Sequence, residues 1–285
     1  MKEYIEGSLN GLSKSILKQV SSNETFLNLA MKEKPEKLPF IIKSTQKVHT
    51  QNYKEFEFHT INEKSKNHMH IIYFHGGGFC LKGGMPQWMM INQWVKHTDA
   101  KTSYIIYPMI PHYKTKEIYE ISFEIYRYLL TLYPNDKFIL IGDSAGCLVI
   151  LSMLQLMKIR SIKAPVLNIL LSPWIDFSLS NPEISKYQEI DKLISVSRFA
   201  GLQDYDNTKE SSDIVSPLCY RYEDLIHIYT GTEDMLFPDM LLFEEKNPQV
   251  KMKIFNNCPH VFMMLPTKQS KIVHEDIIKS IQNQK

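Results

Sequence analysis

The chain has 285 residues, 44% of them hydrophobic and 22% charged, which is typical of a globular protein large enough to bury a full core. Its formal net charge of +2 is spread without a basic stripe, so nothing favours binding to nucleic acid or to an anionic membrane. The first residues lack the apolar core of a signal peptide, and no apolar run reaches the roughly 18 residues of a membrane span. We therefore predict a soluble, cytoplasmic protein without stable membrane association.

The four cysteines and ten histidines give no sign of a metal site. The cysteines stand far apart without a Cys-x-x-Cys pair, and the histidines and carboxylates show no ligand spacing. We predict reduced cysteines, no metal and no cofactor. The sequence carries no signal for a particular oligomeric state.

Residues 1–36 are predicted to be helical, because apolar residues recur there every three or four positions. A capping box at Ser21–Glu24 would open a second short helix that stops before Pro35. The polar face of this segment is not notably basic, so packing on its own domain is favoured over binding to a membrane surface.

From residue 40 the pattern changes to strands that alternate with helices. Phe40–Ile42 and Tyr53–Thr60 are predicted to be antiparallel edge strands. Buried strands are predicted at 69–74, 102–107, 137–141, 165–171, 226–230 and 250–255, and helices at about 86–95, 118–132, 147–151, 238–245 and 272–281. This alternation predicts a mostly parallel sheet with helices on both faces. The polar stretch 177–220 has only short helical pieces and is expected to fold over the carboxyl edge of the sheet, where ligands bind.

Gly142-Asp-Ser-Ala-Gly146 follows one of the buried strands and precedes an apolar helix. A serine between two glycines there is typical of a strained strand-to-helix turn that exposes its hydroxyl. The motif alone is weak, because a tight strand–helix connection uses the same residues. A serine hydroxyl also needs a base and a carboxylate before it becomes a nucleophile.

His260 is the best candidate for the base, because it lies in the loop between the last strand and the last helix. Asp234 follows the penultimate strand and is preferred as its carboxylate, with Asp176, after the preceding strand, as the rival. Gly76–Gly78 follow a buried strand, and because glycine has no side chain, their backbone N–H groups can turn inward as hydrogen-bond donors. The amide of Ala145 supplies a further donor for a developing oxyanion.

With these elements in this order, the chain resembles the α/β-hydrolase family, and within it the hormone-sensitive-lipase-like carboxylesterases. The motifs that carry the resemblance span about residues 68–265 and are HGGGF at 75–79, GDSAG at 142–146, SPWID at 172–176, GTEDML at 231–236 and PHVF at 259–262. Two positions depart from the family: Cys147 replaces a usual glycine and Met235 a usual proline.

The resemblance implies an α/β-hydrolase fold in a single domain, 1–285, with cap elements at about 1–45 and 177–220. It implies Ser144 as nucleophile, Asp234 as acid and His260 as base, with the amides of Gly77, Gly78 and Ala145 as the oxyanion hole. His75 would brace the glycine loop.

The predicted function is a serine carboxylic ester hydrolase that acts on a small-molecule ester through an acyl-enzyme. A modest cap favours short acyl chains, of roughly eight carbons or fewer. Two alternatives remain open: an amidase or deacetylase that uses the same triad, and a non-catalytic small-molecule receptor.

Overall fold

The computed structural model describes residues 1–20, 24–32, 38–187, 189–207 and 214–284. Its centre is a nine-stranded sheet in the order β1-β9-β8-β7-β6-β4-β5-β3-β2. The strands are β1 (Lys2–Ile5), β2 (Val48–Tyr53), β3 (Phe56–Ile61), β4 (Met69–Phe74), β5 (Lys101–Ile105), β6 (Lys137–Asp143), β7 (Leu167–Leu171), β8 (Ile226–Gly231) and β9 (Lys251–Phe255). All neighbouring strands from β1 to β5 in this order are parallel, whereas β3 is antiparallel to both β5 and β2.

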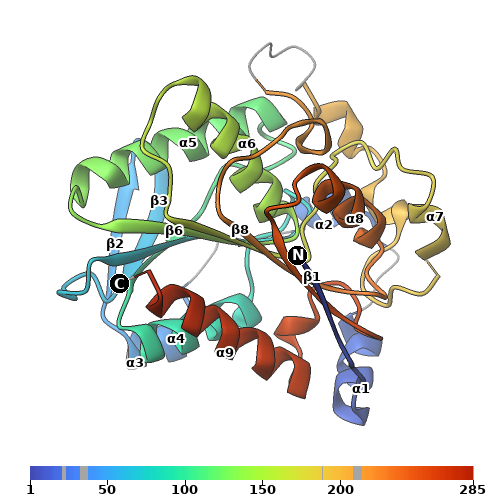
Figure 1. Cartoon of the computed structure of the whole chain (residues 1–285). Helices are drawn as coiled ribbons and strands as arrows, with labels where there is room; N and C mark the ends of the chain where they lie inside the picture. Colours follow the sequence, from blue (N-terminus) through green and yellow to red (C-terminus); the bar gives the residue numbers. More distant parts are fainter. Residues whose placement is uncertain (21–23, 33–37, 188, 208–213, 285) are drawn as a thin grey trace.

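Helices cover both faces of the sheet (Figure 1). The helices are α1 (Gly11–Val20), α2 (Phe26–Ala30), α3 (Phe40–Thr45), α4 (Met85–Thr98), α5 (Thr115–Leu132), α6 (Ala145–Ile159), α7 (Ile184–Tyr187), α8 (Phe237–Lys246) and α9 (Lys268–Gln282). Helices α5, α6 and α8 lie on one face, and α3, α4 and α9 on the other (Figure 1). Strand β4 shows why both faces are apolar, since Ile72 and Phe74 enter one core while Ile71 and Tyr73 enter the other. The predicted mostly parallel sheet covered on both faces is confirmed.

The structure corrects two predictions near the amino terminus. Residues 2–5 form strand β1, which pairs with β9 at the edge of the sheet, rather than part of a helix. This strand is largely exposed and held by backbone pairing, so it has no apolar alternation to detect. Phe40–Ile42 opens helix α3 instead of a strand; only Ile42 is buried, and Pro39 stands at its amino end. A run of three apolar residues does not distinguish the two structures.

Part of the predicted capping box, residues 21–23, lies outside the described residues. The amino end of α2 is instead capped by Thr25, whose Oγ1 accepts a hydrogen bond from the Asn28 N–H at 3.2 Å. Among the described residues, no helix is long and apolar enough to cross a membrane.

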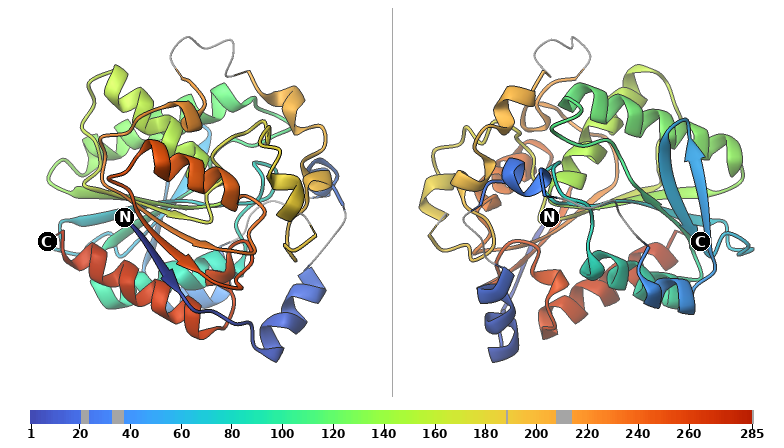
Figure 2. Two further views of the ribbon diagram at one scale, coloured as in Figure 1. Left: turned by 45° about the vertical axis from the view of Figure 1, so that its right-hand side comes forward. Right: turned by 180° about the vertical axis from the view of Figure 1, so that it is seen from behind.

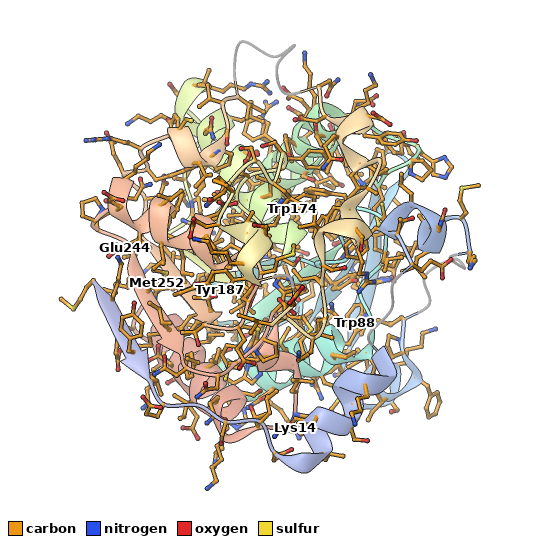
Figure 3. The ribbon with its side chains drawn as sticks, turned by 90° about the vertical axis from the view of Figure 1, so that its right-hand side faces the viewer. Lys14, Trp88, Trp174, Tyr187, Glu244 and Met252 are labelled. Carbon is orange, nitrogen blue, oxygen red and sulfur yellow. The ribbon has the colours of Figure 1, made fainter. Side chains whose placement is uncertain are left out.

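We call the segment 177–220 the cap segment, and its described residues fold over the carboxyl ends of the strands. Its described part contains α7 and three short 3-10 helices, without a strand: η1 (Val196–Phe199), η2 (Leu202–Tyr205) and η4 (Pro217–Cys219). Helix α2 packs against η1 (Figure 2, right). The rings of Phe26 and Phe199 meet there edge to face at 5.1 Å. Figure 3 views this side of the molecule, with Trp174 and Tyr187 labelled. Of the residues 1–45 expected in the cap, α2 therefore joins the cap segment, whereas β1 lies in the sheet and α3 beneath it.

Candidate active site

Ser144 lies on the tight turn between β6 and α6 with φ 49° and ψ −115°, a backbone conformation that few residues other than glycine adopt. The turn is compact because the flanking glycines have no side chains: a Cβ on Gly146 would lie 2.0 Å from the carbonyl oxygen of Phe74. Backbone hydrogen bonds hold the serine in place: its own N–H donates to Leu171 O at 2.9 Å, and its carbonyl oxygen accepts from the N–H groups of Cys147 and Trp174, each at 3.1 Å. The hydroxyl is therefore aimed by the fold at the carboxyl edge of the sheet.

The structure brings Ser144, His260 and Asp234 into one hydrogen-bonded chain. Ser144 Oγ lies 2.9 Å from His260 Nε2, and His260 Nδ1 lies 3.0 Å from each carboxylate oxygen of Asp234. All three side chains are buried, Asp234 completely. The histidine loop is anchored by the Val261 N–H, which donates to Ser172 Oγ at 2.9 Å. Loops that follow three different strands thus meet at one point.

Asp176, the rival carboxylate, does not contact the histidine. Its Oδ2 accepts hydrogen bonds from the hydroxyls of Ser178 at 2.6 Å and Ser180 at 3.0 Å, and its Oδ1 accepts from the Ser178 N–H at 3.3 Å. These contacts cap the turn that begins the cap segment. The carboxylate is fully occupied in shaping that turn.

The charges around His260 favour its protonated form. Burial by itself lowers the pKa of this imidazole, but the facing carboxylates of Asp234, Asp191 and Asp143 outweigh burial, so the net pKa lies above the ordinary histidine value. A histidine with a raised pKa is a stronger base at neutral pH, and its imidazolium is stabilised once it has taken a proton.

The glycine loop after β4 offers free backbone donors near Ser144. Gly77 and Gly78 have φ of 114° and 62°, conformations that favour glycine. Neither amide, nor that of Ala145, has an acceptor within the part of the chain that the structure describes. The Gly76 N–H, in contrast, donates to Asp143 Oδ1 at 2.9 Å. Within the glycine run, only Gly77 and Gly78 therefore keep their donors available.

His75 supports this loop from below. Its fully buried ring stacks on Tyr107 at 4.4 Å, and the Tyr107 hydroxyl donates to the His75 carbonyl at 2.5 Å. Burial lowers the pKa of His75 to about 4, so the ring is neutral at physiological pH. Cys147, which replaces the usual glycine, points its Sγ at Gly142 O, 3.1 Å away. Both residues contribute to packing beneath the turn and stay away from the triad.

Sequence reasoning missed two buried carboxylates beside the site. Asp143 Oδ1 accepts hydrogen bonds from the Gly76 N–H and the Tyr73 hydroxyl, which joins the serine turn to the glycine loop. Asp191, from the cap segment, lies beside Asp234 and His260. A carboxylate oxygen of each aspartate and a ring nitrogen of His260 all lie within 4.8 Å of one another. Asp143 stands within the recognised motif, whereas the polar cap sequence contains nothing that singles out Asp191.

Comparison with known proteins identifies the family. A family model described as the alpha/beta hydrolase fold matches residues 71–264, and the chain belongs to this family. A protein named "Esterase" from Acinetobacter venetianus is 28% identical over 193 residues, which cover 65% of this chain and 63% of that protein. The match thus spans less than two thirds of the relative's length.

Solved structures show the same fold. An esterase from the bacterial hormone-sensitive lipase family superposes with a TM-score of 0.80 and 15% identity, covering 98% of this chain and 99% of that one. A hormone-sensitive lipase from a metagenome library gives a TM-score of 0.77 and 21% identity, covering 95% and 97%. The predicted fold class and the resemblance to the α/β-hydrolase family are confirmed.

Proposed function

We propose that the protein is a serine carboxylic ester hydrolase that acts on small, short-chain acyl esters through an acyl-enzyme intermediate. The observation that carries this proposal is the chain from Ser144 Oγ through the His260 ring to Asp234, with distances of 2.9 and 3.0 Å. Ser144 stands on a strained turn, next to backbone N–H groups that have no acceptor among the described residues. The relative named "Esterase" supports the same chemistry.

In the first half of the reaction, His260 Nε2 accepts the hydroxyl proton while Ser144 Oγ attacks the ester carbonyl carbon. The carbonyl oxygen becomes an oxyanion, and the amides of Gly77, Gly78 and Ala145 donate to it. Each such donor typically lowers the barrier by about 3–4 kcal/mol. His260 then gives its proton to the departing alcohol, and the acyl group remains on the serine.

In the second half, water takes the place of the alcohol. His260 accepts a proton from the water, whose oxygen attacks the acyl carbon, and then returns the proton to Ser144 Oγ as the acid leaves. Asp234 holds the Nδ1–H of the ring and stabilises the imidazolium in both halves. Full burial of this carboxylate keeps water from weakening the interaction.

The proposal is tested by incubating the purified chain with p-nitrophenyl butyrate and, separately, with a fluorophosphonate probe. We expect ester hydrolysis, and a single modified peptide that contains Ser144. A matched amide of the same acyl group should turn over far more slowly. Faster cleavage of the amide would favour an amidase, and labelling without turnover of either substrate would contradict the proposed reaction. Absence of labelling would favour a receptor.

The preferred length of the substrate's acyl chain is predicted from the aromatic side chains that the cap packs against the glycine loop. The Phe26 ring lies against Gly78, where a Cβ would come within 2.8 Å of it. Behind it, the rings of Phe199 and Trp174 meet at 4.8 Å, and both are buried. We expect kcat/KM across a p-nitrophenyl ester series to be highest at eight carbons or fewer, because this aromatic packing limits the depth available to an acyl chain. A palmitoyl ester hydrolysed faster than the butyryl ester would contradict this expectation.

A further inference from the structure

Asp191 is a buried acid that the cap segment places against the acid loop, the turn after β8 that carries Asp234. Only 7% of the residue is exposed. Its Oδ1 accepts hydrogen bonds from the backbone N–H groups of Leu193 at 2.8 Å and Ile194 at 3.3 Å, both within the cap segment. Its Oδ2 accepts the N–H of Met235 at 2.8 Å. The two oxygens of one carboxylate therefore tie the cap to the residue that follows Asp234.

The same carboxylate lies beside the catalytic pair. Atoms of Asp191, Asp234 and His260 lie within 4.8 Å of one another, so these two carboxylates lie next to the imidazole. Asp143, on the serine turn, is the third acid that faces the ring. Arg198 in η1 also faces Asp191, but its Nη1 donates to Leu193 O at 2.7 Å and its guanidinium stacks on Phe26 at 4.6 Å. The charged neighbours of Asp191 are thus Asp234 and His260 on the loops below and Arg198 within the cap.

A second carboxylate in this place has an energetic cost. Burial and the negative charge of Asp234 both raise the pKa of Asp191 above its usual range, and the positive charge that His260 acquires on protonation opposes this rise. The turn of the cap uses only Oδ1, which accepts the N–H groups of Leu193 and Ile194. The other oxygen acts across the boundary between cap and catalytic domain.

We propose that Asp191 is a positioning residue for the catalytic triad: docked from the cap, it fixes the acid loop through the Met235 N–H and places a second negative charge beside His260. The inference rests on the proposed ester hydrolysis for its catalytic meaning. This role would make the pKa of His260 depend on the cap. Among the described residues of the cap segment, Asp191 is the only acid whose carboxylate lies within 4.8 Å of the ring and raises its pKa.

The decisive variant is Asp191→Asn, which keeps the shape of the side chain and removes its charge. Asp239→Asn is the matched control. Asp239, in the first turn of α8, is fully buried and likewise contacts the cap segment, by accepting a hydrogen bond from Asn181 Nδ2 at 2.8 Å. Burial raises its pKa to about 6, and the acid that faces it is Asp176, not the catalytic pair.

The measurement is the pH profile of kcat and kcat/KM for p-nitrophenyl butyrate, on the full chain. Loss of a negative charge beside His260 lowers the pKa of the ring, so in Asp191→Asn the acid limb of kcat/KM should move to lower pH by about one unit. The plateau of kcat should fall about tenfold, because a weaker base and a looser acid loop both slow proton transfer. Asp239→Asn should keep the limb and should keep kcat within about twofold. Coincident profiles for wild type and Asp191→Asn, or a limb that moves to higher pH, would overturn the proposal.

A second measurement does not depend on turnover or on the variant folding. In wild-type protein labelled with ¹⁵N-histidine, the His260 ring resonances, assigned by their loss in His260→Gln, should respond to two titrations. One is that of the ring itself. The other is that of Asp191 above the ordinary range of an aspartate, and it should persist in Asp143→Asn, which removes the titration of the other buried acid with a raised pKa that faces the ring. A single step would overturn the proposal even if Asp191→Asn does not fold. If no ester is hydrolysed but two steps are seen, the proposed reaction falls and the coupling between cap and histidine stands.

Discussion

Replacement of Ser144 by alanine is expected to reduce kcat for p-nitrophenyl butyrate by about 1,000,000-fold, the order of magnitude lost when a triad serine is removed. The loss is large because the variant has no oxygen that can form the acyl-enzyme. His260 and the free amides remain, so the residual rate reflects binding and oxyanion stabilisation alone. Steady-state kinetics at pH 8 would measure the loss, with labelling by the fluorophosphonate probe expected to disappear in parallel.

The control for this variant is Ser152→Ala, a buried serine eight residues further along α6. Eight residues correspond to about 12 Å along a helix, so Ser152 lies beyond the reach of His260. We expect near wild-type kinetics for this control and a free energy of unfolding within about 1 kcal/mol of wild type for both variants. Substantial hydrolysis by Ser144→Ala would place the nucleophile elsewhere and would invalidate the proposed reaction.

Different signals in the sequence predicted the fold and the proposed triad. Each central strand is buried on both faces and therefore appears as an apolar run, as in Met69–Phe74 and Leu167–Leu171. Ser144 was singled out by its flanking glycines, which the structure explains by the 2.0 Å approach that a Cβ on Gly146 would make to Phe74 O. Asp234 and His260 followed from topology, because loops after parallel strands meet at one edge.

Contacts between distant segments were beyond reach of the same signals. Strand β1 pairs with a strand some 250 residues later in the chain through backbone groups, which carry no side-chain signature. Asp191 acts on Met235 across 44 positions, and no periodicity links a polar cap residue to a loop on the sheet. Such positions depend on how the cap docks, which is a property of the whole fold. The sequence alone therefore pointed to the residues of the proposed triad, but it did not point to Asp191, which contacts the loop that carries Asp234.

Asp234→Asn is expected to lower kcat by about 10,000-fold while the protein stays folded. An asparagine at this position presents an amide to His260 Nδ1, and it no longer holds the tautomer whose Nε2 accepts the serine proton. Loss of the carboxylate charge also lowers the pKa of His260. In the wild type, Asp234, Asp191 and Asp143 together raise this pKa by more than burial lowers it. The acid limb of the remaining activity should therefore move to lower pH, which a kcat/KM profile from pH 5 to 9 would detect.

Asp176→Asn distinguishes this explanation from the general loss of a buried acid near the site. Asp176 belongs to the turn with Ser178 and Ser180, so its replacement should cost about 1–2 kcal/mol of unfolding free energy and leave kcat within about threefold. Suppose that Asp176→Asn instead abolished turnover while Asp234→Asn retained it. The carboxylate of Asp176 would then have to reach His260 from the cap turn during the reaction. That outcome would require the 3.0 Å contact between His260 and Asp234 to break before catalysis, and the two profiles measured side by side would show it.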